Sequence, residues 1–186
     1  MGGSFNPVHT GHLMVAGYLS QVAGLDEVWL SMSPANPLKP DAHPVSDTSR
    51  LEMLRLALKG SDRLRAIDTE LSLPRPSYTL QLLERLRQDY PDYDFKLIIG
   101  SDNWLVFDRW HAHDTILHDF GVIIYPRPGY DIKCPDHPAA TLVKAPTVDI
   151  SSTFIREAIA HGLDMNYFLP GSVNKYIIEN KLYTQG

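Results

Sequence analysis

Two histidines lie three residues apart near the start of the sequence, within a stretch that is otherwise rich in small residues, GGSFNPVHTGH. Gly2 and Gly3 lack a Cβ atom, so a ligand can approach the backbone closely there. His9 and His12 stand at the expected start of a helix, where free N–H groups and the helix dipole favour anions. Imidazole rings donate hydrogen bonds to phosphate oxygens, and their charge can adjust near neutral pH. The stretch therefore predicts a phosphate-binding site, in which Gly11 leaves room for a polyphosphate.

A second stretch with the same character, DISSTFIREAI, lies near the other end of the sequence. Ser151 and Ser152 are candidate N-caps of a helix, and Thr153 with the first free amides would offer another seat for an anion. Arg156 lies one turn later, so its guanidinium can reach the same anion with two N–H groups. Each stretch has a structural alternative, since a glycine-rich turn with surface histidines or any capped amphipathic helix looks similar. Together they favour a triphosphate that is held from two sides.

The apolar pattern around these stretches alternates between short β-rich runs and helical periods. Ser77 is the expected N-cap of the third helix. Residues 33–49, rich in Pro, Ser and Asp, are expected to form a long functional loop. The alternation predicts an α/β fold with a Rossmann-like, doubly wound and mainly parallel sheet, whose ligands bind beyond the carboxyl ends of its strands. We expect helices over residues 10–24, 49–60, 77–91, 151–162 and 171–183, and strands within 26–34, 63–71, 95–103, 121–129 and 141–146.

Length, composition and charge limit the class of protein. The 186 residues are expected to form one domain, with the helical part from about 151 to 186 packed on the rest. The net charge of −5 argues against a general binder of nucleic acids or anionic membranes. No apolar run approaches the ~20 residues of a membrane span, and no signal peptide precedes the first motif, so we expect a cytoplasmic protein. The single Cys134 cannot form an internal disulfide.

The segment WHAHDTILHD gathers histidines and aspartates, but we do not interpret it as a metal site. His111 and His113 lie two residues apart, so they do not share a helix face, and no second pair completes a tetrahedral set. Three aromatic residues are interpreted as packing residues, namely Tyr18, Trp29 and Trp104. Three acidic residues are interpreted as solvated charges around a strand, namely Asp62, Asp68 and Glu70.

The two phosphate-binding stretches resemble the signature motifs of the nucleotidyltransferase superfamily, GG(S/T)FxPxHxGH and ISSTxxR. Over nearly the whole chain, further segments are similar to the blocks of bacterial nicotinate-nucleotide adenylyltransferases, in the same order: SPANPLKP, RPSYTLQLLERLR, FKLIIGSDNWLVFDRWHAHDTIL, VIIYPRPGY and LPGSVNKYIIENKLY. The resemblance implies a nucleotidyltransferase-type fold and the transfer of AMP from ATP to nicotinate mononucleotide, which yields nicotinate adenine dinucleotide and pyrophosphate in NAD biosynthesis. It also implies Mg²⁺ that arrives with ATP. No covalent intermediate is needed, because the 5′-phosphate of the mononucleotide is already a nucleophile.

The same resemblance implies roles for single residues. His9, His12 and Arg156 would be catalytic, because they would contact the ATP phosphates and the charge that develops at the reacting phosphorus. Further residues would bind ATP, with Asp102 on a ribose hydroxyl: Gly3, Ser4, Phe5, Lys39, Gly100, Asp102, Arg127, Ser151, Ser152 and Thr153. Another set would hold nicotinate mononucleotide, with Trp110 stacked on the pyridine ring: Asn36, Tyr78, Thr79 and Trp110.

Two other functions remain open on the sequence alone. Pantetheine-phosphate adenylyltransferase shares both signature motifs, although RPSYT and DRWHAHDTIL match the nicotinate enzymes. A nucleotide-binding sensor that has lost turnover would keep the fold, and the presence of His9, His12 and Arg156 argues against it. The expected partners are ATP and nicotinate mononucleotide, with a homo-oligomer as an open option. We expect neither nucleic acid nor membrane as a partner.

A parallel sheet of this type places a strand directly before its first glycine-rich loop, and only Met1 precedes Gly2 here. Strands usually run ~5–6 residues. We therefore expect the first strand to be truncated and the native product to start several residues upstream. The alternative is a family member that pairs residues 1–5 as a short stub and closes the gap with neighbouring side chains.

Overall fold

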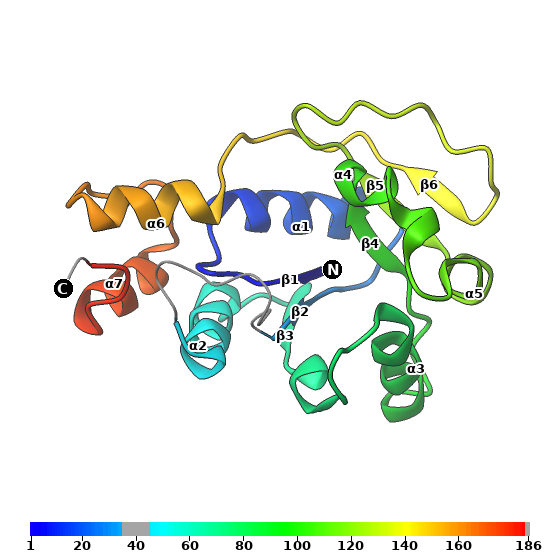
Figure 1. Ribbon diagram of the computed structural model, residues 1–186, viewed down its shortest axis with the longest axis horizontal. Helices are drawn as coiled ribbons and strands as arrows, with labels where there is room; N and C mark the ends of the chain where they lie inside the picture. The colour runs from blue at the N-terminus through cyan, green and yellow to red at the C-terminus, as the bar shows by residue number, and fades with distance from the viewer. Residues whose placement is uncertain (35–44, 185–186) are drawn as a thin grey trace.

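The strands form two three-stranded sheets in a computed structural model that describes residues 1–34 and 45–184 (Figure 1). All pairings between these strands are parallel, which confirms the predicted α/β class. The six strands do not, however, form the one continuous sheet that we expected. The first sheet has the order β1 (Gly2–Gly3), β2 (Val28–Met32) and β3 (Leu64–Ile67), and the second has the order β4 (Leu97–Gly100), β5 (Val122–Tyr125) and β6 (Ala140–Leu142).

β1 spans two residues and pairs only within the first sheet. With only Gly2–Gly3, β1 pairs with Ser31 and Met32 at the carboxyl end of β2. A cavity of about 560 Å³ separates the rest of β2 from β4, and its lining includes Val28 of β2 and Leu97 of β4. The glycine-rich loop therefore starts between the carboxyl ends of the two sheets.

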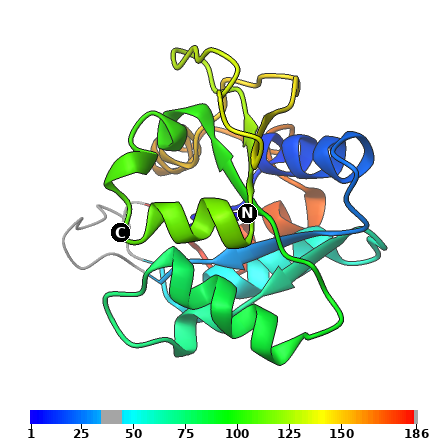
Figure 2. The ribbon, with the colours of Figure 1, turned by 90° about the vertical axis from the view of Figure 1, so that its right-hand side faces the viewer.

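Helices cover both faces of the first sheet, with α1 on one side and α2 on the other (Figures 1 and 2). Each of the five expected helices is present, while the short helices after β4 were not expected. In the part of the chain that the structure describes, no helix is long and apolar enough to cross a membrane. The helices are α1 (Thr10–Val22), α2 (Asp47–Leu58), α3 (Thr79–Asp89), α4 (Ser101–Trp104), α5 (His113–Asp119), α6 (Ser152–Ala160) and α7 (Gly171–Glu179), with 3-10 turns at Thr69–Ser72 and Phe107–Arg109.

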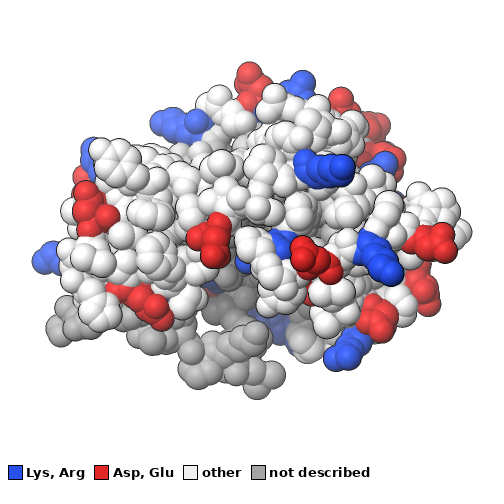
Figure 3. Space-filling model, turned by 90° about the horizontal axis from the view of Figure 1, so that it is seen from above, with Lys and Arg blue, Asp and Glu red and all other residues white. Residues whose placement is uncertain are grey.

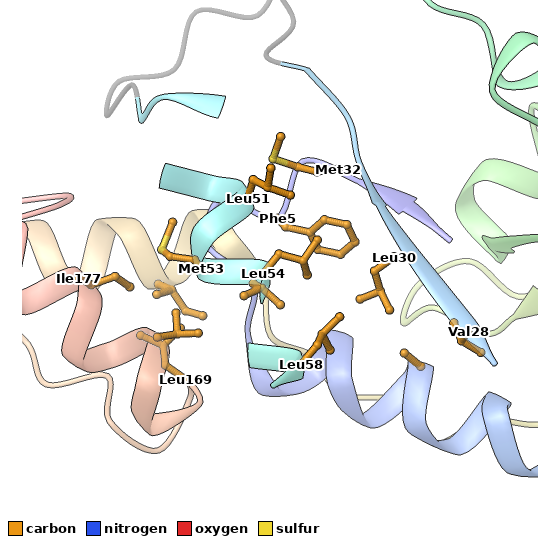
Figure 4. Packing of buried hydrophobic residues seen from close by; sticks show 14 of the residues in the cluster. Phe5, Val28, Leu30, Met32, Leu51, Met53, Leu54, Leu58, Leu169 and Ile177 are labelled. Atoms are coloured by element: carbon orange, nitrogen blue, oxygen red, sulfur yellow. The ribbon is translucent and has the colours of Figure 1, made fainter. Parts of the chain in front are cut away.

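The main hydrophobic core lies between β2, α2 and the C-terminal helices (Figure 4). Leu30 of β2 and Leu54 of α2 are fully buried, and Ile177 of α7 belongs to the same cluster. The ring of Phe5, which follows the glycine-rich turn, points into this cluster and is 1% exposed. The loop that carries the first motif is thus anchored in the core by its aromatic side chain.

Two sequence-based expectations near the third helix were wrong. The N-cap of α3 is Tyr78, whose backbone N–H donates to Oε1 of Gln81 at 3.1 Å, while Ser77 donates its hydroxyl to Glu70 at 3.1 Å. Glu70 is therefore not a solvated charge: it is half-buried, and burial raises the pKa of its carboxyl, an effect that hydroxyl donors oppose. Asp62 and Asp68 are exposed as expected. Ser77 differs from the expectation because its hydroxyl donates to the carboxylate of Glu70 and does not cap α3.

The three aromatic residues that we interpreted as packing residues are confirmed as such. Trp29 is 8% exposed and packs edge-to-face against Tyr90 and Phe95. Trp104 stacks on a neighbouring ring in the core of the second sheet, and Tyr18 packs against the main core.

Arg50 of α2 is the largest fully buried side chain among the described residues, at 2% exposed. Its Nη1 atom donates to the carbonyl oxygens of Ser4 and Ser33, and its Nη2 atom lies 2.6 Å from Asp47 Oδ1. A buried guanidinium is tolerated only when its donors are paired. Here the pairing ties the loop after β1 to the end of β2.

We expect Arg50→Met to lower the free energy of unfolding by roughly 2–4 kcal/mol, because the carbonyls of Ser4 and Ser33 lose the donor that links them and Asp47 Oδ1 loses its partner at 2.6 Å. Urea denaturation measures the loss. The matched control is Arg55→Met in the same helix, whose exposed pair with Asp68 (3.0 Å) is worth at most about 1 kcal/mol. Equal losses in the two variants would show that Arg50 does not hold the loop.

Candidate active site

The two histidines of the first motif meet at the start of α1. His9 is the N-cap residue, and its ring stacks on the ring of His12 with 3.7 Å between the centroids. The backbone N–H of His9 donates to Nδ1 of His12 at 3.3 Å. Because Nδ1 accepts this bond, the neutral His12 ring carries its hydrogen on Nε2 and can donate it to a ligand.

The glycines of the motif are required for close packing within the loop itself. A Cβ atom at Gly11 would lie 3.0 Å from Nδ1 of His9, and one at Gly3 would lie 3.1 Å from the ring of Phe5. Gly11 also lines a cavity of about 200 Å³, so the room that we expected it to leave for a polyphosphate stays a prediction. Phe5 itself has a φ of 43°, a backbone conformation that residues other than glycine rarely adopt.

The second motif is bonded directly to the first. Ser152 donates its hydroxyl to the carbonyl of Pro7 at 2.9 Å, and Nη1 of Arg156 donates to the carbonyl of Asn6 at 2.8 Å. Both acceptors belong to the loop that precedes His9. The start of α6 therefore holds the backbone of the glycine-rich loop, and sequence reasoning had not found Asn6 or Pro7 as its partners.

The N-cap of α6 is Ser151, whose side chain accepts from the N–H of Phe154 at 3.1 Å, as expected. Ser152 was the other candidate, and it is instead the first residue of the helix. Thr153 accepts a long hydrogen bond of 3.4 Å from Arg156. The helix start thus keeps free backbone N–H groups that can bind an anion.

A cavity of about 200 Å³ is lined by residues of both motifs, although Thr153 and Arg156 are not among its lining residues. It lies between the starts of α1 and α6 and the segment that follows β5. Of the expected residues, its lining contains His9, His12, Arg127, Ser151 and Ser152. The structure therefore brings the two motifs together, as the hypothesis of a triphosphate held from two sides requires.

Gly100, Asp102 and Arg127 meet at the adjacent ends of β4 and β5. Nε of Arg127 lies 3.8 Å from Oδ1 of Asp102, and its backbone N–H donates to the hydroxyl of Ser101 at 2.9 Å. A Cβ atom at Gly100 would lie only 2.4 Å from Asp102 and 2.6 Å from Arg127, so glycine is needed at this crossing. Oδ1 of Asp102 is buried and has no hydrogen-bond partner within the described residues.

The electrostatics of the small cavity differ from the sequence-based expectation. Burial lowers the pKa of His9 to about 4, and the charge of Arg127 adds to the effect. Burial, His9 and Arg127 together lower the pKa of His12 to about 3. Both rings are therefore neutral at pH 7 in the ligand-free protein, and their charge does not adjust there. Positive charge at the cavity comes from Arg127.

The surrounding surface adds no strong field. Figure 3 shows Lys and Arg side chains interspersed with Asp and Glu over the described part of one face, in line with the net charge of −5. Binding of an anion here would depend on the donors that line the cavity.

Two of the four residues expected at the mononucleotide line the larger cavity. Thr79 and Trp110 line it together with Gly3, and the Tyr78 ring lies outside it, 4.5 Å from the ring of His111. Ser4 is exposed, and its carbonyl is bound by Arg50 as described above. Asn36 and Lys39 lie outside the described residues.

The neutral state of the histidines predicts how stability depends on pH. In the unfolded chain His9 takes up a proton near pH 6.5, and in the folded protein only near pH 4. Its burial therefore stabilises the protein fully above pH 6.5, and this contribution is lost as the pH falls from 6.5 towards 4. The slope of the unfolding free energy against pH measures how many more protons the unfolded state binds than the folded state, and we expect His9→Asn to lower this difference by about one proton in this range. The control is His118→Asn at an exposed side chain. If His9→Asn and the wild type have the same slope, His9 is not buried as a neutral ring.

Comparisons with known proteins agree with this geometry. The sequence model of the cytidylyltransferase-like family matches residues 1–158. A protein of Bacteroides fragilis named nicotinate-nucleotide adenylyltransferase is 49% identical over 178 residues, which cover 95% of this chain and 89% of that protein. A protein of Bacteroides thetaiotaomicron with the same name is 48% identical, with 95% and 88% covered.

Solved structures share the fold at low sequence identity. The nicotinic acid mononucleotide adenylyltransferase of Plasmodium falciparum, solved in complex with NaAD, has a TM-score of 0.78 at 22% identity and covers 98% of this chain and 94% of its own. A protein of Vibrio parahaemolyticus, described as a nicotinate-nucleotide adenylyltransferase, has a TM-score of 0.70 at 24% identity, with 100% and 93% covered. With identities of almost one half over nearly its full length to curated members, this chain belongs to the nicotinate-nucleotide adenylyltransferase family of nucleotidyltransferases.

Proposed function

We propose that this protein transfers the adenylyl group of ATP to the 5′-phosphate of nicotinate mononucleotide in NAD biosynthesis. A phosphate oxygen of the mononucleotide forms a bond to the α-phosphorus of ATP, the bond between the α-phosphorus and the β-phosphate oxygen breaks, and pyrophosphate leaves. The single observation that carries the proposal is the cavity of about 200 Å³, which is lined by His9 and His12 of the first motif and by Ser151 and Ser152 of the second.

In this proposal the rate comes from alignment and from stabilisation of charge at the reacting phosphorus. The N–H at Nε2 of His12 would donate to a phosphate oxygen, and His9 holds the ring of His12 by stacking. Arg156 would act from the start of α6. The incoming phosphate is already a nucleophile, so no group has to remove a proton from it.

The remaining ATP contacts would be divided between the two sides of the cavity. Ser151, Ser152 and Thr153 would present backbone N–H groups to the phosphates, and Arg127 would supply the positive charge. Asp102 would accept a hydrogen bond from a ribose hydroxyl. Its buried Oδ1 lies 3.8 Å from Nε of Arg127 but accepts no hydrogen bond within the described residues, which supports this role.

The nicotinate end would lie against Trp110 and Thr79. The backbone N–H of Trp110 already donates to Phe107 at 2.9 Å, so it is not the donor that reads the carboxylate. The first N–H groups of α3, which begins at Thr79, have no acceptor within the helix and would take that part.

We infer that a divalent cation would enter this site bound to the phosphates of ATP. The described residues contain no group of three or more His, Cys, Asp or Glu side chains that could hold an ion. The small cavity is lined by two neutral imidazoles, an arginine and the hydroxyls of Ser151 and Ser152, which can donate to phosphate oxygens. We therefore propose that Mg²⁺ arrives bound to the ATP phosphates, where it would neutralise part of their charge.

Release of pyrophosphate from ATP in the presence of nicotinate mononucleotide tests the proposal directly. We expect kcat/KM to be at least about tenfold higher for nicotinate mononucleotide than for nicotinamide mononucleotide. The N–H donors at the start of α3 match a carboxylate, whereas the NH₂ group of the amide would face them without an acceptor. Equal values for the two substrates would contradict this assignment, and absence of release with either would refute the proposed function.

We expect His12→Ala to lower kcat by roughly 10²–10³-fold, because it removes a donor to the transition state. The control is His118→Ala, a change at a side chain that is 90% exposed. Steady-state kinetics at saturating ATP measure the effect, and a thermal melt checks that both variants fold. Activity of His12→Ala within a few fold of the wild type would show that this ring does not act in the transition state.

A further inference from the structure

One carboxylate joins two of the segments that line the larger cavity. Glu70 lies in the 3-10 turn Thr69–Ser72 and accepts a hydrogen bond on each of its two oxygens. Ser33, directly after β2, donates to Oε2 at 3.0 Å, and Ser77, directly before the N-cap of α3, donates to Oε1 at 3.1 Å. Both donors are hydroxyls, so each can serve only one acceptor at a time.

Ser33 is in turn bonded to the phosphate side of the site. Its backbone N–H donates to the carbonyl of Gly3 at 2.9 Å, and its own carbonyl accepts from Nη1 of Arg50 at 3.0 Å. Arg50 also binds the carbonyl of Ser4. A chain of hydrogen bonds therefore runs from the glycine-rich loop through Ser33 and Glu70 to Ser77.

The position of Glu70 makes this connection stronger than an ordinary surface contact. The residue is half-buried, and it lines the same cavity as Thr79 and Trp110. Hydrogen bonds to an ionised carboxylate are stronger than those between neutral groups, and more so where water is partly excluded. Ser77 lies two residues before Thr79, so a shift of Ser77 would move the first N–H groups of α3.

We propose that Glu70 is a positioning residue, which holds the start of α3 against the glycine-rich loop and thereby sets the affinity for the mononucleotide substrate. Glu70 does this without contact to the ATP site, since it is absent from the lining of the smaller cavity among the described residues. The inference rests on the proposed function, in which Thr79 and the start of α3 bind the nicotinate end.

The test compares Glu70→Ala, Glu70→Gln, Ser77→Ala and the double variant Glu70→Ala/Ser77→Ala in the pyrophosphate-release assay. We expect Glu70→Ala to raise the KM for nicotinate mononucleotide about 10-fold, with the KM for ATP changed less than about twofold. Ser77→Ala should raise the same KM about threefold, and the double variant should be no worse than Glu70→Ala, because both changes break one connection. In Glu70→Gln the amide oxygen accepts one hydroxyl and its NH₂ group donates to the other, so its KM should lie close to the wild-type value.

Arg75→Ala is the matched control. Arg75 lies in the same loop, and its contact of 3.5 Å with Asp47 is largely exposed, so we expect both KM values to stay unchanged. The proposal is overturned if Glu70→Ala raises both KM values equally, if it lowers only the melting temperature, or if Glu70→Gln is as damaging as Glu70→Ala.

Hydrogen exchange separates this proposal from the proposed function. We expect the hydrogen-bonded amides of Tyr78 and Leu82 to exchange faster in Glu70→Ala than in the wild type, while those of α1 exchange at the wild-type rate. If the wild type releases no pyrophosphate with nicotinate mononucleotide, the proposed function fails, and exchange at Tyr78 and Leu82 still decides whether Glu70 positions this segment. Unchanged exchange there overturns the positioning role whatever the activity.

Discussion

The buried guanidinium of Arg50 is the interaction on which the arrangement of the site depends. A cation with 2% exposure has to find a partner for its donors inside the protein, and those partners are the carbonyls of Ser4 and Ser33 together with Asp47. The two carbonyls belong to the glycine-rich loop and to the end of β2, which are distant in sequence. One side chain of α2 therefore sets the distance between the loop that would meet ATP and the strand end that faces the larger cavity.

The same loop is held from its other side by α6. Ser152 and Arg156 bind the carbonyls of Pro7 and Asn6, so the second motif has a structural role in addition to any contact with phosphate. The backbone before His9 is therefore hydrogen-bonded both by α6 and by Arg50 of α2. Because this backbone is held in place, the ring of His9 stays stacked on the ring of His12. The free protein consequently holds neutral rings, and the phosphates of ATP would bring the charge that the cavity lacks.

The larger cavity has a different character from the smaller one. Its walls come from both sheets, with Val28 of β2 and Leu97 of β4 in its lining. The hydrogen bonds of Glu70 connect two of the segments that line it. A substrate bound there would meet a wall whose position depends on this carboxylate.

The amino-acid sequence by itself determined the parallel α/β class, the starts of α1 and α6, and the candidate groups at each start. These features are local: small residues, a capping serine such as Ser151 and the apolar period act within one turn of chain. The tertiary structure alone decided the partners of the buried polar groups. Ser77 was predicted to cap α3, and its hydroxyl is instead bonded to Glu70. Ser152 donates to the carbonyl of Pro7, 145 residues away in sequence. Glu70 is half-buried although it lies in a polar segment of the sequence. Arg50 had one signal in the sequence, since it shares a helix face with Met53 and Leu54, but its acceptors lie in other segments. A buried donor or acceptor must be paired wherever the fold provides a partner, and no local pattern records where that partner lies.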